Sequence, residues 1–221
     1  MCSPSCIDFG KKYIKEEYVK DRAVIEVGAY NFNGSLRSLV EDFYPASYIG
    51  VDISPGPAVD QICNAEDLIA SFGNNKFDML ICTELLEHVG NWQKVVHNIK
   101  NVMKPRGILI LSTRSIGFPW HPCPNDFWRF QIQDIRLIFS DFAIDVLKSD
   151  PHDMGVFLFA RKPNGFVENN LNNYKLYSMI CVKQTKYLIY CILWRNIKKV
   201  KYYLSHPSKI FNFIKRKVRA C

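Results

Sequence analysis

The sequence predicts an α/β fold in which helices cover both faces of a doubly wound, mostly parallel sheet of seven strands. Apolar runs of strand length lie at residues 23–27, 47–53, 77–83 and 107–113, and helix-like amphipathic segments lie between them. Near-continuous apolar strands are typical of a parallel sheet that is buried on both faces. The charged residues are distributed unevenly along the chain. Residues 1–163 hold 17 Lys and Arg against 20 Asp and Glu, whereas residues 164–221 hold 12 Lys and Arg against 1 Glu.

The elements follow in order along the chain. Residues 1–19 are expected to form a helical lead-in, and the main domain is placed at residues 20–163. Segments 142–150 and 155–163 meet at the turn-like Asp-Pro-His-Asp sequence and predict an antiparallel C-terminal hairpin. The polar residues 164–173 are interpreted as a linker, so that 164–221 is a linker followed by a basic, amphipathic helical tail.

Composition places the chain among folded, globular proteins. It has 221 residues, of which 48% are hydrophobic and 23% charged, which argues against wholesale disorder. The first 20 residues turn polar early and carry no export leader, which favours a cytoplasmic location.

Two strand ends predict a ligand site. Gly28 and Gly34 bracket the loop after the first strand, where glycine permits a close backbone approach. Asp52 ends the second strand, and a carboxylate there is suited to the hydroxyls of a ribose. The GxGxxG pattern of dinucleotide sites is absent, which disfavours a nicotinamide oxidoreductase.

Five segments together resemble the successive motifs of class I S-adenosylmethionine-dependent methyltransferases of the small, type-11-like branch. They are VIEVGAYNFNGS, YIGVDIS, CNAEDL, FDMLICTELLEHV and MKPRGILILSTRS, in this order. The resemblance implies a Rossmann-like fold and S-adenosylmethionine as cofactor. The glycine loop departs from the family's usual GxGxG, since Gly28 is followed by Ala29 and Tyr30.

The resemblance also assigns cofactor contacts. Glu26 and Gly28 would approach the methionine moiety, Asp52 the ribose, and Ala65 with Glu66 the adenine. Thr83 and Glu84 would border the cofactor and the substrate entrance. The remaining cofactor residues in the assignment are Ala29, Gly34 and Ile53.

The segment GFPWHPCPNDFWRF at 117–130 is the most distinctive. Its prolines and aromatic residues are suited to a lid, in which His121 and Asp126 are candidates for a catalytic base or for substrate orientation. Candidate substrate contacts are His88, Trp120, Trp128 and Arg129. In the alternative interpretation the segment is a rigid connector, with Trp128 in the core and Asp126 paired with Arg129. No metal site is expected, because His121 and Cys123 alone are too few ligands.

The basic tail predicts a partner. Lys and Arg alternate with aliphatic and aromatic residues over 174–219, a pattern typical of a helix on an anionic membrane surface. The leading hypothesis is methyl transfer to a small-molecule, glycan or lipid-linked acceptor near a membrane. The alternatives are an RNA or protein methyltransferase that holds its polymer with the tail, and a non-catalytic binding module.

Overall fold

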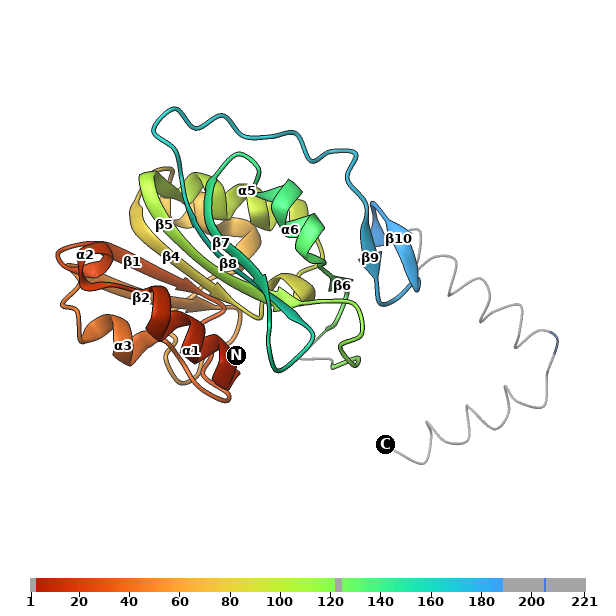
Figure 1. Cartoon of the computed structure of the whole chain (residues 1–221), viewed down its shortest axis with the longest axis horizontal. Helices are drawn as coiled ribbons and strands as arrows, with labels where there is room; N and C mark the ends of the chain where they lie inside the picture. Colours follow the sequence, from red (N-terminus) through yellow and green to blue (C-terminus); the bar gives the residue numbers. More distant parts are fainter. Residues whose placement is uncertain (1–2, 122–124, 189–204, 206–221) are drawn as a thin grey trace.

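A seven-stranded sheet organises the chain (Figure 1), with strand order β3-β2-β1-β4-β5-β8-β7. The computed structural model describes residues 3–121, 125–188 and 205. The strands of this sheet are β1 (Ala23–Val27), β2 (Ser47–Asp52), β3 (Gln61–Ile62), β4 (Phe77–Thr83), β5 (Met103–Arg114), β7 (Ala143–Ser149) and β8 (Gly155–Arg161).

The sheet is parallel from β3 to β5, and β8 then runs antiparallel to both β5 and β7. The prediction of a Rossmann-like, mostly parallel sheet with an antiparallel C-terminal hairpin is therefore confirmed. Because β1, β2 and β4 are parallel, their carboxyl ends meet at one edge, which is where ligands bind in such sheets.

Helices cover both faces of the sheet (Figure 1). One apolar core lies under α1 (Pro4–Tyr13), α2 (Glu16–Val19) and α3 (Arg37–Glu41). The other lies under α4 (Leu68–Phe72), α5 (Trp92–Val102) and α6 (Ile132–Ile138). Alternate residues of β1 enter opposite cores, with Val24 in the first and Ile25 in the second, as the period of a strand requires.

Two short 3-10 helices complete the part that positions the site. They are η1 (Ala65–Asp67) before α4 and η2 (Leu86–His88) after β4. Asn64 caps η1, because its side-chain oxygen accepts a hydrogen bond from the Glu66 amide at 2.9 Å.

The segment after residue 163 corrects one expectation. Within the region predicted as a helical tail, β9 (Leu176–Ser178) and β10 (Lys183–Thr185) form a second sheet with β6 (Trp128–Arg129), in the order β10-β9-β6. Trp128 pairs with Ser178 in this sheet. Strands of two or three residues form here because a distant strand supplies their hydrogen bonds. The rest of the predicted tail helix lies outside the described residues.

The predicted linker is packed against the domain. The Asn169 side chain accepts a hydrogen bond from the fully buried Lys100 ammonium at 2.8 Å, and its amide donates to the Leu137 carbonyl at 2.8 Å. Lys100 also contacts Asp141 at 2.6 Å. Among the described residues, no helix is long and apolar enough to span a bilayer.

Candidate cofactor and acceptor site

A cavity of about 650 Å³ opens at the carboxyl ends of β1, β2 and β4. It reaches from the loops after β1 and β2 to the loop after β5. Its lining comprises Val27, Gly28, Tyr30, Phe32, Asp52, Ile53, Ser54, Pro55, Cys63, Asn64, Ala65, Glu66, Glu84, Leu85, His88, Val89, Gly90, Asn125 and Phe127.

The loop after β1 depends on Gly28. Its φ of +81° is one that residues with a Cβ rarely adopt, and a Cβ there would lie 3.2 Å from the Leu85 side chain. The amides of Gly28 and Ala29 both donate to the Val51 carbonyl, at 2.9 and 3.0 Å. These bonds hold the loop against β2 and keep the floor of the cavity open.

Asp52 stands at the rim of the cavity. Its carboxylate accepts hydrogen bonds from the Tyr30 and Ser54 amides, each at 3.2 Å. The two amides fix the orientation of the carboxylate between the loops after β1 and β2. Ile53, beside it, is half exposed and lines the same cavity.

Four of the predicted cofactor residues do not line the cavity: Glu26, Ala29, Gly34 and Thr83. Glu26 is buried below the loop, where Tyr48 and Ser35 donate to its carboxylate. Burial raises the pKa of Glu26, against the lowering effect of these two donors. Gly34 closes the loop by donating to the Asn31 side chain at 2.9 Å. Glu26 and Gly34 therefore hold the loop after β1 in shape without lining the cavity.

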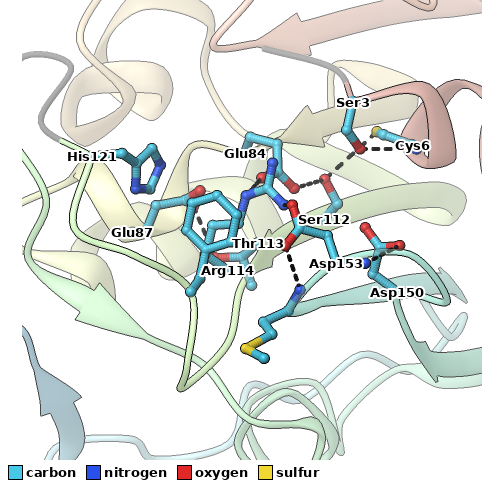
Figure 2. Close-up of polar contacts among 12 residues, drawn as sticks. Ser3, Cys6, Glu84, Glu87, Ser112, Thr113, Arg114, His121, Asp150 and Asp153 are labelled. Carbon is cyan, nitrogen blue, oxygen red and sulfur yellow. Dashed lines mark hydrogen bonds and ion pairs between the residues drawn. The ribbon is translucent and has the colours of Figure 1, made fainter.

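Two buried carboxylates, Glu84 and Glu87, follow β4, and Glu84 lines the cavity. Glu84 follows β4 at a φ of +52°, accepts a hydrogen bond from the Ser112 hydroxyl at 2.6 Å and pairs with Arg114 (Figure 2). Burial and then the neighbouring Glu87 carboxylate raise the pKa of Glu84 to about 7. A strained backbone at a cavity wall is typical of functional positions.

The segment after β5 is held by a buried ion pair. Asp126 contacts Arg129 at 2.7 Å and accepts a hydrogen bond from the His121 amide at 2.9 Å, and the Asp126 and Arg129 side chains are fully buried. Burial, which would raise the pKa of Asp126, is outweighed by the hydrogen bonds from Arg129 and His121, so this pKa is strongly lowered. An enclosed carboxylate of low pKa is poorly suited to act as a base.

The structure does not bring all predicted substrate residues to the cavity. Trp128 and Arg129 are buried away from it, because the Trp128 indole donates to the Val89 carbonyl at 2.9 Å and Arg129 is bound to Asp126. Trp120 is 63% exposed and does not line the cavity. The interpretation as a rigid connector therefore describes Trp128, Asp126 and Arg129 better than the lid does.

His88 and His121 face one another beside the cavity. His88 lines the cavity, and its Nδ1 contacts the Asn125 carbonyl. The His121 ring lies 4.9 Å from the His88 ring, edge to face, and its Nδ1 is 3.2 Å from Asp126. His121 thus stands beside the residues that line the cavity.

Twelve residues of the lining were not among the predicted site residues, and several of them are aromatic. Tyr30 and Phe32 follow the first glycine of the loop with ring centroids 5.1 Å apart, and Leu85, Asn125 and Phe127 line the cavity beside His88. The aromatic residues between Gly28 and Gly34 were a signal for the first pair.

Comparison with known proteins identifies the fold family. The model of the methyltransferase domain family matches residues 7–143, which is more than half of the chain. The chain belongs to this methyltransferase family. The predicted resemblance to class I S-adenosylmethionine-dependent methyltransferases, and S-adenosylmethionine as the cofactor of this class, are thereby confirmed.

A relative and two solved structures agree with this family. The chain is 26% identical over 160 residues to a ubiquinone biosynthesis O-methyltransferase of Coxiella burnetii, covering 66% of this chain and 62% of that protein. An S-adenosylmethionine-dependent methyltransferase from Mesorhizobium loti matches with a TM-score of 0.52 and 13% identity, over 72% of this chain and 99% of the other.

The second structure contains a product of the cofactor. It is a Burkholderia thailandensis 1,6-didemethyltoxoflavin-N1-methyltransferase with bound S-adenosylhomocysteine, with a TM-score of 0.51 and 15% identity over 72% of this chain and 77% of that one. At these identities the two structures establish the shared fold. The chain spans 62% of the length of the Coxiella relative.

Proposed function

We propose that this methyltransferase transfers the methyl group of S-adenosylmethionine to an oxygen of a small-molecule acceptor. The observation that carries the proposal is one cavity that joins the Asp52 carboxylate to His88, Asn125 and Phe127. The end of the cavity at Asp52 suits a ribose, and the end at His88 and Phe127 offers polar and aromatic groups to an acceptor. The name of the Coxiella relative supports an oxygen acceptor on a small molecule.

Methyl transfer from S-adenosylmethionine needs few catalytic groups from the protein. The sulfonium already activates the methyl group, so the site chiefly has to align the acceptor oxygen with the sulfur–carbon bond. Asp126 acts here as a positioning residue for His121, and His88 faces the acceptor end of the cavity.

The test is methyl transfer to a panel of phenols, hydroxylated isoprenoid lipids and glycans, with RNA and protein as further acceptors. Mass spectrometry detects a gain of one methyl group. We expect an O-methylated small molecule and loss of turnover in Asp52→Ala. Methylation of RNA or protein alone, or a nitrogen product, would contradict the proposal.

The basic C-terminal region supports a location at an anionic membrane. Residues 164–221 hold 12 Lys and Arg against 1 Glu. We expect the full chain to sediment with vesicles rich in anionic lipid, and the triple variant Lys215→Gln, Arg216→Gln, Lys217→Gln to bind them at least threefold more weakly. Equal binding of the two proteins to the vesicles, or release of the protein from the vesicles when RNA is added, would favour another partner for the tail.

A further inference from the structure

Three side chains from two loops converge beside the cavity. Glu87 and His88 belong to η2, and His121 follows β5. One ligand atom from each of the three lies within 4.8 Å of the other two, and the Glu87 Oε1 to His88 Nε2 distance is 3.9 Å. Because His88 and His121 are 33 positions apart in the sequence, only the fold brings them together.

Two of the facing atoms lack a hydrogen-bond partner. Within the described part of the chain, Glu87 Oε1 and His88 Nε2 are buried and unsatisfied, and Glu87 is fully buried. A buried polar atom without a partner destabilises the fold, because it loses its hydrogen bonds to water and gains none in return. Two such atoms that face one another therefore point to a ligand between them that accepts lone pairs from both.

The outer atoms of His88 and Glu87 are already bound, and the Nδ1 of His121 faces a carboxylate. His88 Nδ1 contacts the Asn125 carbonyl, and His121 Nδ1 lies 3.2 Å from the Asp126 carboxylate. The second oxygen of Glu87 accepts a hydrogen bond from the Thr113 hydroxyl at 2.9 Å. Metal-binding histidines and carboxylates are commonly held in this way, with the outer atom on a carbonyl, carboxylate or hydroxyl and the inner atom on the ion.

Charge also favours a cation at this point. Glu84 and Glu87 are both buried, and the Arg114 guanidinium is bound to Glu84 and to Asp153 at 3.1 Å (Figure 2). Within the described residues, no Lys or Arg forms an ion pair with the Glu87 carboxylate. Figure 2 shows the His121 ring on the side of Glu87 away from Asp150 and Asp153.

We propose that Glu87, His88 and His121 bind one zinc ion, with an open position toward the acceptor end of the cavity. Two histidines and one glutamate are a ligand set typical of zinc sites that keep a fourth position for water or substrate. Magnesium and calcium prefer oxygen ligands, so two imidazoles disfavour them.

The role of the zinc ion in catalysis rests on the proposed O-methyl transfer. An acceptor hydroxyl at the open position would become more acidic and release its proton to water. The oxygen–carbon bond then forms as the sulfur–carbon bond breaks, which leaves S-adenosylhomocysteine and the methyl ether.

The test is zinc binding by the full chain, prepared without a histidine tag and freed of metal by chelation. Calorimetry and elemental analysis give affinity and stoichiometry for the wild type, Glu87→Gln, His121→Ala and the control His152→Ala. His152 is exposed and lies outside the cluster. We expect one zinc per chain, at least tenfold weaker binding in the first two variants, and unchanged binding in the control.

Footprinting of the wild type makes the test independent of variant folding. Zinc should protect His121, whose ring is more exposed than that of His88, from diethylpyrocarbonate and leave His152 reactive. Stoichiometry far below one, equal affinity in well-folded Glu87→Gln and His121→Ala, or no protection would overturn the site. Titration with S-adenosylmethionine is run separately, so a chain that binds the cofactor but not zinc contradicts the site alone.

Discussion

Arg129 lies against Asp126 with both side chains fully buried, and its guanidinium also donates to the Pro119 carbonyl at 3.0 Å. This pair fixes the segment after β5, so that His121 and Asn125 meet His88 beside the cavity. Breaking a buried pair costs far more than forming it gains, because the remaining charge stays in a medium that solvates it poorly.

The substitution Arg129→Met should therefore lower the free energy of unfolding by about 3–5 kcal/mol. Urea denaturation followed by circular dichroism measures the change. The matched control is Arg161→Met, which removes an exposed pair with Asp145 and should cost under about 1 kcal/mol. Similar losses in the two variants would contradict the structural role of the Asp126 pair.

Asn169→Ala tests whether residues 164–173 are part of the packed domain. Loss of the Asn169 amide removes hydrogen bonds to Lys100 and to the Leu137 carbonyl, and should destabilise the protein by about 1–3 kcal/mol. Asn172→Ala, at an exposed neighbouring position, should change stability by less than about 0.5 kcal/mol. Thermal or urea denaturation distinguishes the two, and an unaffected Asn169→Ala would restore the linker interpretation.

Gly28→Ala tests the loop that forms the cavity floor. A Cβ at a φ of +81° is strained and would meet Leu85 at 3.2 Å, so we expect about 1 kcal/mol of destabilisation and weaker binding of S-adenosylmethionine. Gly90→Ala is the control, because Gly90 also lines the cavity but a methyl group there would meet no atom within 4 Å. Calorimetry should show normal cofactor binding in this control.

Asp78 should make stability depend on pH in the acid range. Burial would raise the pKa of Asp78, but hydrogen bonds from the Lys104 ammonium at 2.7 Å and the Ala23 amide at 3.0 Å lower it. A carboxyl whose folded pKa is lowered contributes stability above its unfolded pKa of about 4, and this contribution is lost as the pH falls through the folded value.

We therefore expect Asp78→Asn to be less stable than the wild type at pH 7, by roughly 0.5–1 kcal/mol, and to approach it near pH 3. Denaturation midpoints measured across this range check the sign. A difference that grows as the pH falls would show that the lowered pKa is not what links Asp78 to stability.

Local patterns were enough to predict the main sheet and part of the site. The apolar runs at 23–27 and 77–83 are strands because their side chains enter cores on both faces, and the pattern of apolar residues alone indicates this. Gly28 and Asp52 could be found because each stands at the end of a strand. Tyr30 and Phe32 lie in the same loop as Gly28, and their aromatic character is the local signal that they line the cavity.

Long-range contacts explain what the sequence did not reveal. β9 has three residues and exists because it pairs with β6, some fifty positions earlier, so its composition alone resembled a helix. Asn169 looked like linker because its partner Lys100 is distant. The convergence of Glu87 with His121 likewise depends on two separate loops, whereas in the sequence His121 could be considered as a metal ligand only together with its neighbour Cys123.

The central claim is that the cavity beside Asp52 binds S-adenosylmethionine. Calorimetric titration with S-adenosylmethionine and S-adenosylhomocysteine tests it most directly, using the wild type, Asp52→Ala and the exposed control Asp67→Ala. We expect micromolar binding of both ligands by the wild type and the control, and at least tenfold weaker binding by Asp52→Ala. Absence of binding, or equal binding by all three proteins, would contradict this account of the cavity.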